Sequence, residues 1–141
     1  MKNPMENTKV NELYGLVKIG NKSKAYNIGD MNMIPPPLAN DVIGDTPILV
    51  SWCPLCGSLM AHKRKVDGKT LTFSVIGVRE LDGTGIENLH LKDEETGSIW
   101  AQAMGTAVEG PKKGKELEQI PIQIFNKEVI KKMGVKVWEP R

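Results

Sequence analysis

The dipeptide Asp67-Gly68 stands between two runs rich in apolar and β-branched residues, LMAHKRKV before it and KTLTFSVIGV after it. Asp-Gly is strongly favoured in a type I′ turn, because both central residues of that turn need a positive φ. A turn of this type joins adjacent antiparallel strands, so the sequence predicts a β-hairpin here. Leu71, Phe73 and Val75 are then predicted to share one face of the second strand.

Further hairpin signals recur along the chain. Strands are predicted near residues 13–19 and 23–28 around Gly20, over the apolar run 47–52, and in a hairpin over 89–103 that turns at 94–97. Shorter strands are predicted near 120–124 and 135–138. Asn40-Asp41 and Gly44-Asp45 carry turn chemistry, the prolines at 35–37 favour an extended stretch, and the basic stretch 62–65 is interpreted as a solvated strand face.

One helix is predicted near the C-terminus. Asn126 is a candidate N-cap, Val129, Ile130 and Met133 supply an apolar face, and Gly134 is a stop signal. The sequence therefore predicts a mainly β fold. It would have a flexible leader over 1–12 and a single β-rich domain over 13–141, with antiparallel hairpins in a compact sheet or partly open barrel and one short C-terminal helix.

Composition excludes several classes of function. The 141-residue chain has a formal net charge of +2 and only 5% aromatic residues, which argues against a nucleic-acid partner. No run reaches the ~18 apolar residues of a transmembrane helix. The polar N-terminus shows no signal peptide, which favours a cytoplasmic protein; the alternative is an extracytoplasmic protein, if this chain is a trimmed mature form.

The segment WCPLCGS holds both cysteines, Cys53 and Cys56, at the end of the apolar run. The spacing of a CxxC pair fits three alternatives: thiol-disulfide redox chemistry, two ligands of a metal site, or a turn that uses cysteine structurally. The short connection to the hairpin at 67–68 leaves no room for the helix of a thioredoxin fold, but thiol chemistry does not depend on that fold.

A metal site needs further ligands. A zinc site would be completed by His62 and His90, although a separation of six residues between Cys56 and His62 is not a usual finger spacing. Copper would suit the two sulfurs with help from a methionine, and a homodimer would share four cysteines between two chains. Either cofactor, Zn or Cu, therefore stays open at this point.

Several blocks of the chain together resemble the domain-of-unknown-function 3179 family. They are KAYNI (24–28), AND (39–41), WCPLCGS (52–58), DGKTLTFSVIG (67–77) and DEETGSIWAQAMGTAVEGP (93–111). The resemblance implies no activity. It implies that one constellation includes the following residues: Asn40, Asp41, Cys53, Cys56, Asp93, Ser98, Trp100 and Gln102. Relatives commonly carry an export signal or lipoprotein leader, which implies an extracytoplasmic setting.

These observations predict a domain whose function centres on the Cys53–Cys56 pair, as a soft-metal or thiol-disulfide redox site. Cys53 is expected to be the more exposed sulfur. Trp52 and Trp100 are expected to wall the site, with Gln102 or Asp93 hydrogen-bonding at its edge. The alternative is a non-enzymatic interaction module, in which the cysteines only brace a turn and an exposed surface meets a protein partner.

Overall fold

The computed structural model describes residues 12–33, 37–81 and 83–140. The predicted leader over 1–12 therefore falls almost entirely outside the described residues, as does most of the proline stretch. In chain order the elements are β1 (Leu13–Ile19), β2 (Lys22–Asn27), α1 (Ile28–Met33), β3 (Leu38–Ile43), β4 (Thr46–Cys53), β5 (Ser58–Lys63), β6 (Lys65–Val66), β7 (Lys69–Thr70), β8 (Phe73–Glu80), β9 (Glu87–Asp93), β10 (Ile99–Ala101), β11 (Thr106–Glu109), β12 (Gln119–Ile120), β13 (Ile122–Asn126), α2 (Lys127–Met133) and β14 (Lys136–Val137).

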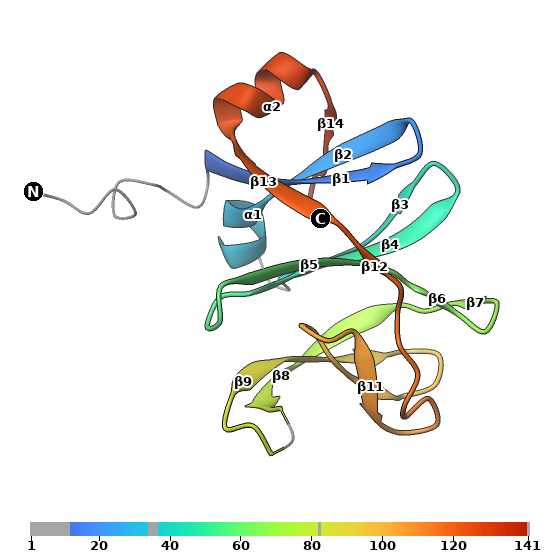
Figure 1. The fold of residues 1–141 in the computed structure, drawn as a ribbon. Coiled ribbons are helices and arrows are strands. Elements are labelled where there is room, and N and C mark those ends of the chain that lie inside the picture. Colours follow the sequence, from blue (N-terminus) through green and yellow to red (C-terminus); the bar gives the residue numbers. More distant parts are fainter. Residues whose placement is uncertain (1–11, 34–36, 82, 141) are drawn as a thin grey trace, which may run out of the picture.

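The described strands form three four-stranded sheets and one two-stranded hairpin, β6-β7. The first sheet has the order β13-β1-β2-β14, the middle sheet β12-β5-β4-β3, and the third sheet β11-β10-β9-β8. Figure 1 shows them as layers, with the middle sheet between the other two. Neighbouring strands pair antiparallel except β14 with β2. The predicted fold class, mainly β with antiparallel hairpins and a short C-terminal helix, is confirmed.

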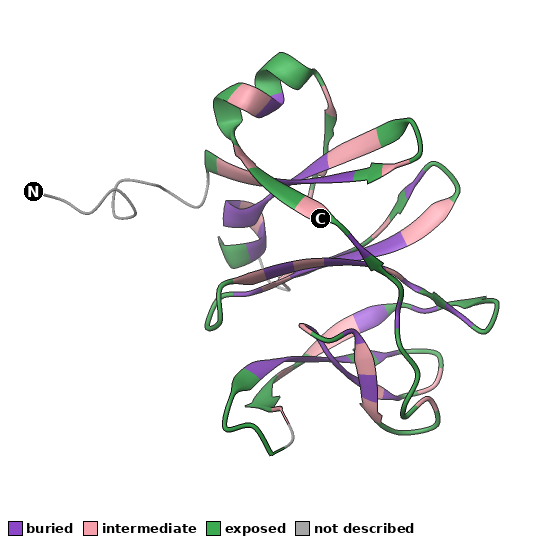
Figure 2. Ribbon diagram, in the orientation of Figure 1, coloured by how far each residue is buried: buried purple, intermediate pink, exposed green. Residues whose placement is uncertain are grey.

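Strand β4 lies at the centre of the molecule and is buried on both faces (Figure 2). Ile48 and Val50 point into the core between the first and middle sheets. Leu49 and Cys53 point into a second core between the middle and third sheets. A strand covered on both faces needs apolar residues at successive positions, which accounts for the unbroken apolar run in this part of the sequence.

The hairpin turns follow the local chemistry of the chain. Asp67 and Gly68 have φ values of 52° and 78°, as the predicted type I′ turn requires. The hairpin around Gly20 and the one that turns at 94–97 are also present, as β1-β2 and β9-β10. The hairpin at 67–68 is short, however: its arms β6 and β7 pair over two residues each, and the longer flanking strands β5 and β8 join different sheets.

The C-terminal helix α2 has the predicted ends. The Asn126 side chain accepts a hydrogen bond from the Val129 backbone N–H at the start of the helix. Gly134 ends it in the left-handed conformation with φ 65°. Ile130 is the buried residue of the helix and packs with Leu16 and Ala25 of the first sheet.

The structure departs from the sequence-based interpretation at three places. Residues 28–33 form the short helix α1, which begins where the Asn27 side chain accepts a hydrogen bond from the Asp30 N–H. Asn40 and Asp41 lie within strand β3 instead of a turn, because they pair with Leu49 and Ile48 of β4. Only half of the basic stretch is solvated: Lys65 is exposed, but His62 is 1% and Arg64 8% exposed, and Arg64 donates to three backbone carbonyls.

Candidate functional site

The two cysteines form a disulfide at the tip of the β4-β5 hairpin. Cys53 ends β4 and stands opposite Ser58, the first residue of β5, with the two cysteine Cα atoms 5.5 Å apart. The connecting turn is closed by the Gly57 N–H, which donates to the Cys53 carbonyl at 2.8 Å. Gly57 has φ 64°, a conformation that glycine adopts without steric cost.

The two sulfur-bearing residues differ sharply in exposure, and in the opposite sense to the expectation. Cys53 is 0% exposed and belongs to the core between the middle and third sheets. Cys56 is exposed in the turn. The reversal follows from strand alternation, because Cys53 continues the inward-facing series of Leu49 and Ser51 along β4. Cys56 is therefore the more exposed residue of the pair.

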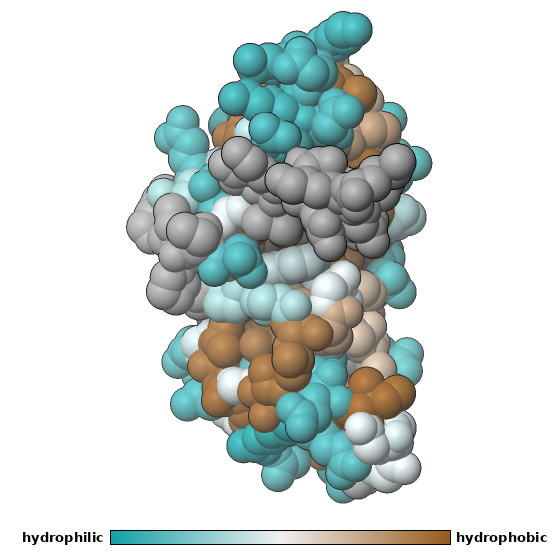
Figure 3. Space-filling model, turned by 90° about the vertical axis from the view of Figure 1, so that its left-hand side faces the viewer, coloured by the Kyte–Doolittle hydropathy of each residue, from teal (hydrophilic) through white to brown (hydrophobic). Residues whose placement is uncertain are grey.

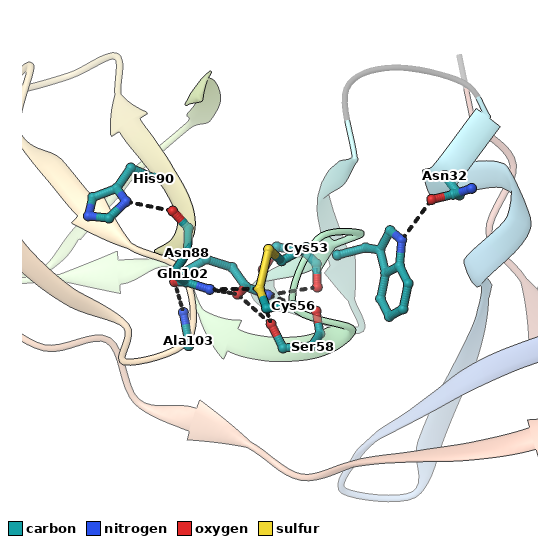
Figure 4. The surroundings of a disulfide bond; sticks show 10 residues. Asn32, Cys53, Cys56, Ser58, Asn88, His90, Gln102 and Ala103 are labelled. Atoms are coloured by element: carbon teal, nitrogen blue, oxygen red, sulfur yellow. Dashed lines mark hydrogen bonds between the residues drawn. A yellow bond between two sulfur atoms is a disulfide. The ribbon is translucent and has the colours of Figure 1, made fainter. Parts of the chain in front are cut away.

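Two buried carboxamides reach the disulfide from the third sheet (Figure 4). The Asn88 Nδ2 of β9 donates to Cys56 Sγ at 3.2 Å and to Gln102 Oε1 at 3.1 Å. Gln102, which directly follows β10, donates through Nε2 to the carbonyls of Ser51 and Ser58. Both side chains are 2% exposed. Ser58 completes the group, because its hydroxyl donates to Gln102 Oε1 and lies 3.5 Å from Cys56 Sγ.

The predicted edge residue Gln102 thus lies at the disulfide, whereas Asn88 was not predicted. Asn88 lies at the site because the third sheet packs on the middle sheet, and no local sequence motif predicts that packing. Its neighbours along β9 include charged residues as well as apolar ones, so the strand sequence itself gives no signal that Asn88 is buried.

The predicted aromatic walls are placed differently. Trp52 is half-buried and packs against the first core, and its indole N–H donates to Asn32 of α1 at 3.1 Å. Trp100 shares the second core with Cys53, where it meets the edge of Phe73. Its indole N–H donates to Asp93 at 2.8 Å.

Asp93 is fully buried at the opposite end of β9 from Asn88. Its carboxylate accepts hydrogen bonds from Trp100 and from the backbone and hydroxyl of Thr96. Ser98 is also fully buried, and its hydroxyl accepts the Lys112 N–H at 2.9 Å. The structure therefore gathers these residues at the β9-β10 turn and not around the sulfurs.

The remaining residues that the resemblance singles out join the sheets. The Asn40 amide bonds both the N–H and the carbonyl of Phe73, at 2.8 and 2.9 Å, and so links β3 to β8. Asp41 accepts from Tyr26 and lies 2.7 Å from the Lys24 ammonium. Burial would raise the pKa of Asp41, but hydrogen bonds from Lys24, the Val42 backbone and Tyr26 outweigh it, so its pKa is lowered.

The proposed metal ligands do not come together. His62 pairs with Leu49 on the ladder, four positions from the Cys53–Ser58 pair, which is about 13 Å along a strand. Burial lowers the pKa of His62 to about 4, so its ring is neutral at pH 7. Within the described ranges, no three or more His, Cys, Asp or Glu side chains are grouped as a metal site would need. His62 therefore does not complete a zinc site with the two cysteines, and we derive no metal chemistry from these residues.

The second histidine faces a separate pocket. The His90 Nδ1 lies 2.9 Å from the Asn88 carbonyl, and Figure 4 places the ring on the far side of Asn88 from the disulfide. The ring is 3% exposed and lines an open pocket of about 430 Å³. The other lining residues are Arg79, Glu80, Leu81, Thr84, Met104, Val108 and Glu109.

The surface beside the disulfide carries exposed apolar side chains. Leu55, in the turn itself, is 67% exposed, Met104 is 60% and Ile86 is 58% exposed. Met104 follows Ala103, whose N–H donates to Asn88 Oδ1, and Ile86 lies two residues before Asn88, so all three flank the same hydrogen-bonded group. Figure 3 shows apolar surface gathered over the lower half of this side of the molecule.

Fold and site together define a layered β-protein with a CxxC disulfide at an exposed hairpin tip. The chain belongs to the family described as "Protein of unknown function (DUF3179)", whose family model matches residues 6–133. Searches of curated proteins and of solved structures gave no match. No helix in the described part of the chain is long and apolar enough to cross a membrane.

Proposed function

We propose that Cys53 and Cys56 form a reversible thiol-disulfide redox site. The observation that carries the proposal is the asymmetry of the pair: one cysteine is exposed in a turn, and the other is sealed in the core beside it. An exposed sulfur can exchange with an external thiol or disulfide, whereas its buried neighbour is available only to the first sulfur. This division of roles is what thiol-disulfide exchange through a mixed disulfide requires.

A purely structural role is poorly supported by the length of the closed loop. The disulfide joins residues three apart in sequence. Restricting so short a loop stabilises the fold by about 2 kcal/mol in the chain-entropy estimate. The hairpin is also held by six ladder pairs between β4 and β5 and by the Gly57 N–H. We therefore expect the strands that carry the bond to stay paired when it opens.

Two external thiols supply the electrons that reduce the disulfide. A first thiolate attacks Cys56 Sγ, and the Cys53–Cys56 bond breaks. Cys53 Sγ leaves with the electron pair and takes a proton. A second thiol attacks the external sulfur of the mixed disulfide as its thiolate, which releases Cys56 as a thiolate and forms an external disulfide. Two electrons pass to the protein, and the reverse sequence returns them.

Equilibration of the full chain in dithiothreitol buffers of graded redox ratio tests this proposal. Free thiols are counted by alkylation and mass spectrometry, without denaturant. We expect one reversible transition in which both thiols form together. The Cys53→Ala and Cys56→Ala variants should show no such transition. A disulfide that resists excess reductant until the protein is unfolded would contradict the proposal and favour a bracing role in an interaction module.

Elemental analysis of the reduced protein, after exposure to zinc or copper(I) and desalting, separates the remaining alternative. The redox proposal expects no stoichiometric metal to be retained. One tightly held ion per chain or per two chains would instead favour the soft-metal site.

A further inference from the structure

The Asn88 side chain is fixed in one orientation beside Cys56. Its Oδ1 accepts the Ala103 backbone N–H at 2.8 Å, which leaves the two Nδ2 hydrogens as the donors. One acceptor is Gln102 Oε1 at 3.1 Å and the other is Cys56 Sγ at 3.2 Å. A flipped amide would place its oxygen against both of these acceptors and its nitrogen against an N–H. The surrounding hydrogen bonds therefore fix one side-chain N–H of Asn88 toward the sulfur.

Gln102 links Asn88 to the backbone of the middle sheet. Its Nε2 donates to the Ser51 and Ser58 carbonyls at 3.2 and 3.1 Å, which fixes its Oε1 on the side of Ser58 and Asn88. The two amides thus form a series that begins on the backbone of β4 and β5 and ends at the sulfur. Among the described residues, the hydrogen bonds to sulfur go to Cys56 and not to Cys53.

From this geometry we infer that Asn88 is a catalytic residue of the redox site, and that Gln102 is its positioning residue. The inference rests on the proposed redox function. A donor aimed at a sulfur favours the thiolate over the thiol, because the hydrogen bond is stronger to the charged form. The Asn88 amide therefore makes Cys56 the nucleophile of the reduced protein.

The step that Asn88 assists is the attack of Cys56 on an external disulfide. The Cys56 thiolate forms a bond to one external sulfur, and the other external sulfur leaves with the electron pair and takes a proton. Cys53 then loses its proton and attacks Cys56 Sγ, which re-forms the internal disulfide and releases the second external thiolate. The external disulfide gains two electrons and the protein loses two. Asn88 acts before the first bond forms, by holding Cys56 as a thiolate.

Alkylation of Cys56 with iodoacetamide across a pH series tests the inference in the Cys53→Ala background, which leaves one thiol. Asn88→Leu should move the midpoint of the rate profile upward by about one pH unit and slow the reaction at pH 7 roughly ten-fold. Asn88→Asp should move it at least as far, because a carboxylate adds repulsion. Gln102→Leu should shift it in the same direction by less.

Asn40 provides the matched control. Its amide also links two sheets through backbone bonds, but it has no contact with sulfur. Asn40→Leu should leave the midpoint within a few tenths of a pH unit of the parent. Profiles of the Asn88 variants that coincide with the parent would overturn the inference while leaving the redox function intact. A parent whose Cys56 does not react at all would instead overturn the redox function.

An NMR measurement on the unmodified reduced chain tests the inference without depending on the folding of any variant. The side-chain amide resonances of Asn88 should titrate with the midpoint of the Cys56 alkylation profile, because the amide loses or gains a charged acceptor. An Asn88 amide that stays constant through that midpoint would overturn the inference.

Discussion

The two interfaces between the three sheets are built from the same central strand but differ in chemistry. Between the first and middle sheets, the buried cluster consists of apolar side chains and Tyr26, whose hydroxyl reaches Asp41 at the edge. Between the middle and third sheets, an apolar cluster continues into buried polar residues. Those residues are Ser51, His62, Asn88 and Gln102.

Burying polar groups costs free energy unless each finds a partner. In the second interface the two carboxamides have partners, but the Ser51 hydroxyl and His62 Nδ1 have none among the described residues. The first interface is thus mainly apolar, while the second gives up some stability at the buried polar groups that lack partners among the described residues. Function is therefore best sought at the polar end of the second interface.

Substitution of Gly105 by alanine should have the largest effect on the second interface. Gly105 has φ 66°, and a Cβ there would lie 2.6 Å from His62 Nε2. Backbone strain and the close contact together should lower the free energy of unfolding by about 3 kcal/mol. Urea unfolding of the oxidised protein measures this loss.

Gly20 is the control for the backbone term, because its φ is 61° and nothing lies within 4 Å of a Cβ built there. Gly20→Ala should cost about 1 kcal/mol. Equal losses at the two glycines would show that the His62 ring yields easily and that this interface is loosely packed.

Protonation of His62 should have the next largest effect. Its pKa is lowered by burial from 6.5 to about 4, so between these values the unfolded chain binds more protons than the folded one. The contribution of His62 to stability is therefore full above pH 6.5 and falls as pH decreases toward 4. We expect a loss of about 2 kcal/mol between pH 7.5 and pH 5, from urea unfolding at each pH.

The His62→Gln variant isolates this effect, because glutamine has no titration in the window. The difference in pH dependence between the two proteins should account for the expected loss. A His62 ring that titrates near pH 6.5 by NMR would show that water enters the second interface and that the contrast between the interfaces is smaller than the burial indicates.

Local chemistry predicted the elements that depend on near neighbours. The turns at Gly20 and at Asp67-Gly68 follow from φ requirements, and the ends of α2 follow from Asn126 and Gly134. The unbroken apolar run before Cys53 predicted a strand there, but not which segments cover its two faces. The stacking of three sheets depends on contacts between distant segments, which periodicity does not record.

The candidate site was predictable to the same extent. The spacing of Cys53 and Cys56 identified the pair, but their relative exposure depends on which face of β4 meets the third sheet. Asn88 lies 32 residues from Cys56 in sequence, and only the packing of β9 brings them together. Asp93 and Trp100 belong to a conspicuous block of the sequence, yet their polar atoms bond each other at the far turn.

Substitution of Ser51 by alanine should have the smallest effect. Its side chain is fully buried, and its hydroxyl has no hydrogen-bond partner in the part of the chain that the structure describes. Removing an unpartnered hydroxyl removes a desolvation cost, so the free energy of unfolding should stay level or rise by up to about 1 kcal/mol. The neighbouring Val50→Ala change, on the opposite face of β4, should instead cost about 2 kcal/mol, because it leaves a void in the apolar core. A loss in Ser51→Ala as large as that in Val50→Ala would mean that the hydroxyl is hydrogen-bonded to a buried water molecule. The second interface would then be hydrated, and Ser51 would not be an unsatisfied polar group.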